Sequence, residues 1–112
     1  MDLMTTIRSE SENHPYSGTK ETFKELSRIL ERNQLLTILM EECAEVTVEA
    51  SKVIRFANTD ADCRQPPLER ELGDLMCMVE LLEEYRLIDM AQVAVAAKNK
   101  REKLKKWSDL NV

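Results

Sequence analysis

The chain has 112 residues, enough for one domain, and its two glycines and three prolines favour long helices over a sheet. A hydrophobic fraction of 43% is ordinary for a globular protein and argues against global disorder. The formal net charge of −5 argues against binding of a nucleic-acid polymer, although six basic residues gather between Lys98 and Lys106.

The cysteines and the apolar runs exclude several classes of protein. Cys43, Cys63 and Cys77 are odd in number and form no CxxC pair, so they are interpreted as reduced thiols. A zinc site is not expected, because the single histidine, His14, lies in a distant polar segment. No apolar run approaches the ~20 residues of a membrane span, and the N-terminus lacks a signal-peptide core. We therefore expect a cytoplasmic protein without a membrane partner.

The N-terminal third predicts an arm followed by a helix. Residues 1–18 are polar and predict a flexible or loosely docked arm, ahead of a helical domain at residues 19–112. Thr19, or less strongly Thr22, is a suitable cap for a first helix. Its apolar residues recur at helical spacing, at Phe23, Leu26, Ile29 and Leu30. The polar residues 31–34 are either a break or an exposed turn of one continuous helix.

Three further helices are predicted downstream. The second runs from about Asn33 to Ala57 and has an apolar stripe at Leu36, Leu39, Cys43, Val46, Ala50 and Val53. After the loop NTDADCRQPP, Pro66 or Pro67 suits the first turn of a third helix that ends near Tyr85. Its stripe is Leu68, Leu72, Leu75, Val79 and Leu82. Residues 86–89 predict a turn, and a fourth helix follows to about Trp107. Four helices with short connections predict an all-α four-helix bundle.

Carboxylates lie on one face of the second helix. Glu42, Glu45 and Glu49 are spaced by three and then four residues, and like charges at that spacing weaken a helix by ~0.2–0.5 kcal/mol per pair. The third helix repeats the pattern with Glu71 and Asp74. Since a short loop requires the two helices to be antiparallel, these residues predict one cluster of carboxylates between them.

The apolar residues of both helices match in the same register. With Glu71 and Asp74 opposite Glu42 and Glu45, Met78 falls beside Ile38 and Leu81 beside Leu35. Close carboxylates disfavour joint ionisation, and a divalent cation offsets that cost. Oxygen ligands select a hard ion such as Mg²⁺, Mn²⁺ or Ca²⁺. The alternative is a solvated acidic face in which Glu49 pairs with Lys52.

The composite of EECAE at 41–45 and ELGD at 71–74, with 25 residues between, resembles a known family signature. It is similar to the EExxE…ExxD motif of the all-α nucleoside triphosphate pyrophosphohydrolases, which include MazG, the MazG-like proteins and dimeric dUTPase and dCTPase enzymes. The segment SKVIRF at 51–56 resembles short MazG-like proteins, many of them phage-encoded. The resemblance covers residues 33–107.

The resemblance implies a MazG-like four-helix bundle, completed by assembly into a homodimer or homotetramer. It also implies hydrolysis of a (deoxy)nucleoside triphosphate to the monophosphate and pyrophosphate, dependent on Mg²⁺ with Mn²⁺ as a substitute. By position it assigns the metal ligands to Glu42, Glu45, Glu71 and Asp74. Glu41 is a catalytic candidate beside Glu42 and Glu45: it either orients a ligand or water, or faces solvent.

Phosphate contacts are less sharply assigned by the resemblance. The segment AAKNKREKLKKW matches the family's phosphate-contacting segment loosely and offers Asn99, Lys100 and Lys103, with Arg101 behind them. The alternative interpretation is an exposed amphipathic helix end stabilised by the helix dipole. Lys52 and Arg55, which follow the acidic stripe, are further candidates.

Two other functions remain open from the sequence. One is a non-enzymatic, homo-oligomeric helical module whose acidic stripe binds a basic partner. The other is a nucleotide-binding regulator that has kept the fold and lost the activity. Self-association is expected on physical grounds too, because the second helix carries apolar residues on more than one face, at Leu35, Leu36, Ile38, Leu39 and Met40.

Overall fold

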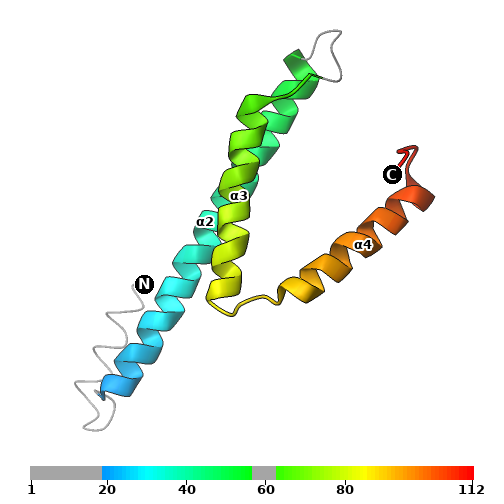
Figure 1. Ribbon diagram of the computed structural model, residues 1–112. Coiled ribbons are helices and arrows are strands. Elements are labelled where there is room, and N and C mark those ends of the chain that lie inside the picture. The colour runs from blue at the N-terminus through cyan, green and yellow to red at the C-terminus, as the bar shows by residue number, and fades with distance from the viewer. Residues whose placement is uncertain (1–18, 57–62) are drawn as a thin grey trace. The chain divides into compact units, whose positions relative to one another are not determined.

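The computed structural model describes residues 19–56 and 63–112, in which there are three helices and no strand (Figure 1). Helix α2 spans Lys20–Phe56, α3 spans Pro66–Glu84 and α4 spans Met90–Trp107. The predicted all-α class is therefore confirmed. The predicted arm at 1–18, and residues 57–62 of the predicted loop, lie outside the described residues. The chain divides between Thr37 and Ile38 into two compact units.

The first two predicted helices are one continuous helix, so the described residues hold three helices where the sequence predicted four. The polar segment at 31–34 is an exposed turn of α2, the second of the two interpretations left open above. It contains neither glycine nor proline, so no residue there interrupts the backbone ladder. The hydroxyl of Thr37 donates to the carbonyl of Asn33 at 2.8 Å, a bond that a continuous helix permits.

The start of α2 follows the sequence prediction. The backbone N–H of Thr22 donates to Oγ1 of Thr19 at 3.3 Å, so Thr19 caps the helix and satisfies one of its free donors. The predicted apolar spacing is visible in the burial, since Leu26 is buried and its predicted partners are half-buried: Phe23, Ile29 and Leu30.

The boundaries of α3 and α4 also agree closely with the prediction. Pro66 occupies the first turn of α3, where its missing N–H costs no hydrogen bond. After α3, the N–H of Leu87 donates to the carbonyl of Leu82 at 2.9 Å and Arg86 adopts a φ of 59°, so the chain leaves the helix through a left-handed residue. Asp89 then caps α4, its Oδ1 accepting from the N–H of Ala91 at 2.9 Å.

Within the second unit, the later part of α2 and the whole of α3 form an antiparallel hairpin (Figure 1). The less exposed side chains on each helix recur at spacings of three and four, the pattern of two helices packed along a seam. We call these two rows the facing stripes. They are Leu39, Glu42, Val46, Glu49 and Val53 on α2, and Leu68, Glu71, Leu75, Met78 and Leu82 on α3. Carboxylates thus interrupt an otherwise apolar seam.

Three residues predicted for the core are exposed instead: Leu36, Cys43 and Leu72. The sequence interpretation placed the acidic and the apolar stripes side by side and assigned the core to the purely apolar one. The facing stripes lie between the acidic and the apolar stripe, and in this orientation Met78 and Leu82 are buried. The three cysteines are free and exposed, so Cys43 and Cys77 are not core residues.

Helix α4 differs from the other two in that none of its residues is buried. No helix in the described part of the chain combines the length and apolarity needed to cross a bilayer.

Candidate metal site

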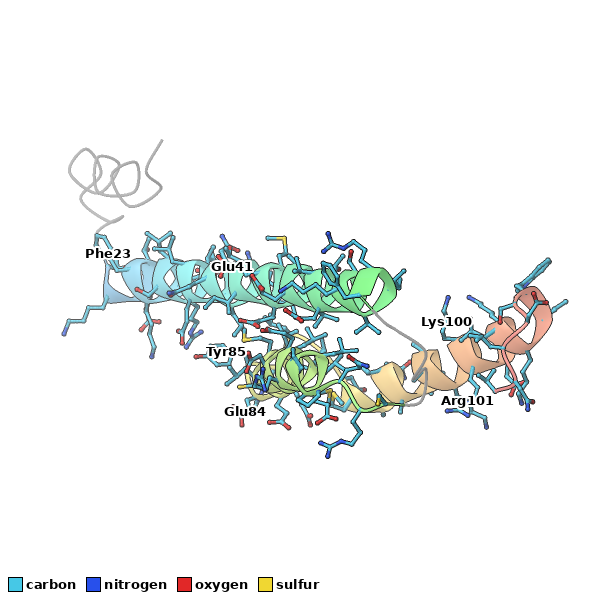
Figure 2. All side chains as sticks on the ribbon, turned by 90° about the horizontal axis from the view of Figure 1, so that it is seen from above. Phe23, Glu41, Glu84, Tyr85, Lys100 and Arg101 are labelled. Atoms are coloured by element: carbon cyan, nitrogen blue, oxygen red, sulfur yellow. The ribbon has the colours of Figure 1, made fainter. Side chains whose placement is uncertain are left out.

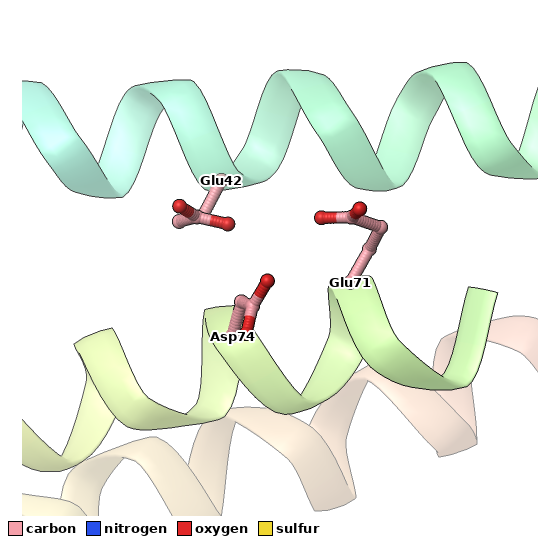
Figure 3. A group of neighbouring side chains, drawn as sticks. All are labelled: Glu42, Glu71 and Asp74. Carbon is pink, nitrogen blue, oxygen red and sulfur yellow. The ribbon is translucent and has the colours of Figure 1, made fainter. Parts of the chain in front are cut away.

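Three carboxylates meet where α2 and α3 face each other. Glu42 comes from α2, and Glu71 and Asp74 come from consecutive turns of α3, so their three-residue spacing puts both on the side towards α2 (Figure 3). One oxygen from each lies within 4.8 Å of the others. Glu42 and Glu71 are half-buried and Asp74 is exposed, so the group opens to solvent on one side. The predicted convergence of the two acidic motifs is present in the structure.

The group carries uncompensated negative charge. No lysine or arginine in the described residues forms an ion pair with any of the three carboxylates. The pKa of Glu71 is raised above its ordinary value, first by loss of hydration and then by repulsion from neighbouring carboxylates, in decreasing order Asp74, Glu45, Glu42 and Glu49. A carboxyl with a raised pKa is one whose anionic form the protein does not stabilise, and a bound cation would reverse that balance.

The donor set suits a hard divalent cation. Mg²⁺ binds oxygens at about 2.0–2.1 Å, so two ligands on opposite sides of the ion lie roughly 4.1 Å apart. The oxygens of the group lie up to 4.8 Å apart, somewhat farther than two oxygens that bind one Mg²⁺. Rotation of these partly exposed side chains can bring the oxygens that much closer. Three carboxylates also leave coordination positions for water or phosphate oxygens, as Mg²⁺ sites in phosphate enzymes require.

Glu45, the fourth predicted ligand, is not in the group. It lies one turn beyond Glu42 on α2 and is exposed, although its charge is close enough to contribute to the raised pKa of Glu71. The catalytic candidate Glu41 is exposed as well. Glu49 is half-buried and pairs with Lys52, with Nζ and Oε1 2.9 Å apart. This ion pair was part of the predicted solvated alternative, and it occurs beside the carboxylate group rather than in place of it.

The predicted phosphate contacts are not gathered at the carboxylates. Lys52 is held by Glu49, and the guanidinium of Arg55 lies over the ring of Phe56, 5.3 Å from its centroid. Three candidates lie exposed on α4 without a hydrogen bond or ion pair to any described residue: Asn99, Lys100 and Lys103. Lys100 and Arg101 extend from different sides of that helix (Figure 2).

No cysteine or histidine joins the group, and it is the single cluster of potential metal ligands among residues 19–56 and 63–112. The sequence therefore identified every carboxylate that the structure brings together. The sequence did not show that Glu42 joins the group and Glu45 does not, because both lie on the same acidic face of α2. Which of the two approaches α3 depends on the rotation of α2 about its axis.

Comparison with known proteins adds no relative. No protein-family model, no curated protein and no solved structure matches this chain.

Proposed function

We propose that the protein is a Mg²⁺-dependent nucleoside triphosphate pyrophosphohydrolase of the MazG-like type, acting as a homodimer or homotetramer. It would convert a (deoxy)nucleoside triphosphate and water to the monophosphate and pyrophosphate. The observation that carries the proposal is the meeting of Glu42, Glu71 and Asp74, which come from the two acidic motifs of the sequence, at one point between α2 and α3.

In this proposal Glu42, Glu71 and Asp74 hold the cation, and Glu45 approaches from the next turn of α2. Mg²⁺, or Mn²⁺ in its place, would neutralise charge on the phosphate oxygens and lower the pKa of a bound water. Such catalysis rests on positioning and charge neutralisation rather than on a covalent intermediate. The described residues agree with that route, because they include no histidine that could activate a serine or cysteine.

The attacking water needs an acceptor for its proton and an orientation in line with the leaving group. Glu45 and Glu41 are the candidates, since both carboxylates are exposed and lie within one turn of Glu42. The water oxygen forms a bond to the α-phosphorus, and the bond from that phosphorus to the α–β bridging oxygen breaks. Pyrophosphate leaves with the bridging oxygen. Cations for the outer phosphates would come from Lys52, Arg55, Lys100 and Lys103. Asn99 would donate a hydrogen bond from its neutral side-chain amide.

A panel of ribo- and deoxyribonucleoside triphosphates tests the reaction. Pyrophosphate release should depend on Mg²⁺ or Mn²⁺ and disappear in EDTA. Glu71→Gln should abolish turnover while circular dichroism shows unchanged helicity. Glu84→Gln is the matched control, because Glu84 is an exposed acid of α3 outside the group, and it should keep full activity.

The same experiment separates the alternatives. If no triphosphate is cleaved and Mg²⁺ leaves the melting temperature unchanged, the acidic face is a docking surface for a basic partner rather than a metal site. Metal-dependent stabilisation without cleavage of any triphosphate would favour a regulator that binds nucleotide.

A further inference from the structure

The hairpin has a second apolar surface beside its facing stripes. On α2, one residue on from the facing stripe, uncharged side chains recur at spacings of three and four: Met40, Cys43, Thr47, Ala50 and Ile54. Met40 is 63% exposed and Ile54 is 82% exposed. A fully solvated face on a helix usually carries charges, and this row has none.

Helix α3 repeats this arrangement. One residue on from its facing stripe lie Leu72, Met76 and Val79, with Glu69 and Glu83 at the two ends of the row. Leu72 is 42% and Met76 52% exposed. One residue is a rotation of about 100° on a helix. Because the two helices are antiparallel, the same rotation from their common seam leads to the same side of the hairpin. The two rows therefore form one surface, which we call the second apolar face.

Helix α4 has a complementary character. Its own row at spacings of four and three is Met90, Ala94, Ala97, Arg101 and Leu104, and none of these residues is buried. The helix carries six basic residues and one glutamate, a formal charge of +5, whereas α3 carries six acids and one arginine, a formal charge of −5. An apolar row with an arginine in its middle is best covered by a surface that supplies a carboxylate, because a buried guanidinium needs a charged or hydrogen-bonding partner.

The second apolar face supplies such carboxylates. Helical spacing places Glu80 and Glu83 along its edge on α3, next to Met76 and Val79. Both glutamates are exposed, and neither they nor Arg101 form an ion pair in the described residues. One chain thus contains a basic apolar helix and an acid-edged apolar surface, and leaves both uncovered.

We propose that α4 of one copy packs on the second apolar face of another copy, and that the exchange is reciprocal. Every copy brings one α4 and one second apolar face, so two copies cover all four surfaces in a closed, isologous pair. The opposite charges of α3 and α4 favour a helix α4 as the occupant, because a second hairpin on this face would oppose like charges. The α4 of the same chain buries none of its residues, which leaves the α4 of another copy as the occupant. The inference rests on the homo-oligomeric part of the proposed function and is independent of hydrolysis.

Two disabled variants test the exchange by complementation. Ala94→Asp/Leu104→Asp breaks the row of α4, and Met40→Asp/Met76→Asp breaks the second apolar face. In sedimentation velocity the wild type should be a dimer, and each variant alone should be a monomer with wild-type helicity. An equimolar mixture should regain a heterodimer, since the intact α4 of one variant packs on the intact face of the other. Native mass spectrometry would identify the heterodimer by mass.

Matched controls place aspartate on exposed valines that point elsewhere: Val95→Asp on α4 and Val48→Asp on α2 should both remain dimeric. Arg101→Glu should raise the dimer dissociation constant more than tenfold. A wild type that is monomeric both in a roughly millimolar stock and after 100-fold dilution of that stock overturns the proposal. A protein that remains dimeric in both double variants also overturns it. So does a pair of monomeric variants whose mixture forms no heterodimer, since α4 would then pack on its own hairpin or on a different protein.

Discussion

Helices α3 and α4 are almost the same length, 19 and 18 residues, yet they contribute to the fold in opposite ways. Helix α3 buries Met78 and Leu82, whereas α4 buries nothing. The difference follows from the side chains in their rows. The facing stripe of α3 has three leucines and a methionine, whereas the row of α4 has two alanines and an arginine among its five residues. Alanine forms a good helix but removes little apolar area from water, so α4 is stable as a helix without being anchored by burial.

The largest expected difference between the two helices is in core truncation. Leu82→Ala should lower the free energy of unfolding by about 2–5 kcal/mol, because Leu82 is 6% exposed and its removal leaves a cavity. Leu104→Ala in α4 should cost about 1 kcal/mol or less at concentrations where the chain is monomeric. Urea unfolding followed by circular dichroism measures both. Equal losses would show that α4 is packed as deeply as α3.

A smaller effect is expected at the start of α4. Asp89→Ala removes the side chain that accepts from the N–H of Ala91, and should cost about 1 kcal/mol. Because no burial holds this helix, the loss should appear as fraying, with faster amide exchange over the first turn of α4 and unchanged exchange at Met78. Asp89→Asn, which keeps the cap, is the control and should behave as wild type.

The exit from α3 should respond in the other direction. Arg86 has a φ of 59°, a conformation that costs a residue with a Cβ more than it costs glycine. Arg86→Gly should therefore raise the free energy of unfolding by about 0.5–1 kcal/mol, after the greater entropy of glycine in the unfolded chain is subtracted. Thermal unfolding of this variant and of Arg86→Ala compares them directly. An Arg86→Ala protein as stable as Arg86→Gly would contradict this account of the turn.

The sequence predicted the helix ends well, and the rotation of the helices less well. Thr19 and Pro66 act through neighbours within a few residues, so local chemistry was enough to place them. The core positions Leu36 and Cys43 were wrong because an apolar stripe and an acidic stripe lie next to each other on α2. Which of them faces α3 is decided by the fit of side chains from the other helix, and a single helix does not contain that information.

The same limit applies to the carboxylates. Antiparallel pairing and register were enough to predict that Glu42, Glu71 and Asp74 would meet. Glu45 lies outside the carboxylate group because of the rotation of α2 about its own axis. That rotation is the one at which Met78 and Leu82 of α3 are buried. The predicted number of helices was wrong for a simpler reason. The first and second predicted helices are one helix, because a polar segment free of glycine and proline continues a helix as readily as it ends one.

The smallest expected effect is the pH dependence of the carboxylate group, because its members are partly solvated and their repulsion is screened. The folded protein raises the pKa of Glu71, so it holds that proton more tightly than the unfolded chain does. Without metal, stability should be greatest when Glu71 is protonated and should fall as the pH rises from the ordinary glutamate range through the raised pKa. Glu71→Gln should remove this fall, and Glu84→Gln should retain it, in melting curves recorded in EDTA. Mg²⁺ should act in the opposite sense, stabilising the wild type more as the pH rises, because it binds the ionised carboxylates. A wild type and a Glu71→Gln protein with parallel pH profiles would show that the carboxylates are too far apart in solution to share a cation.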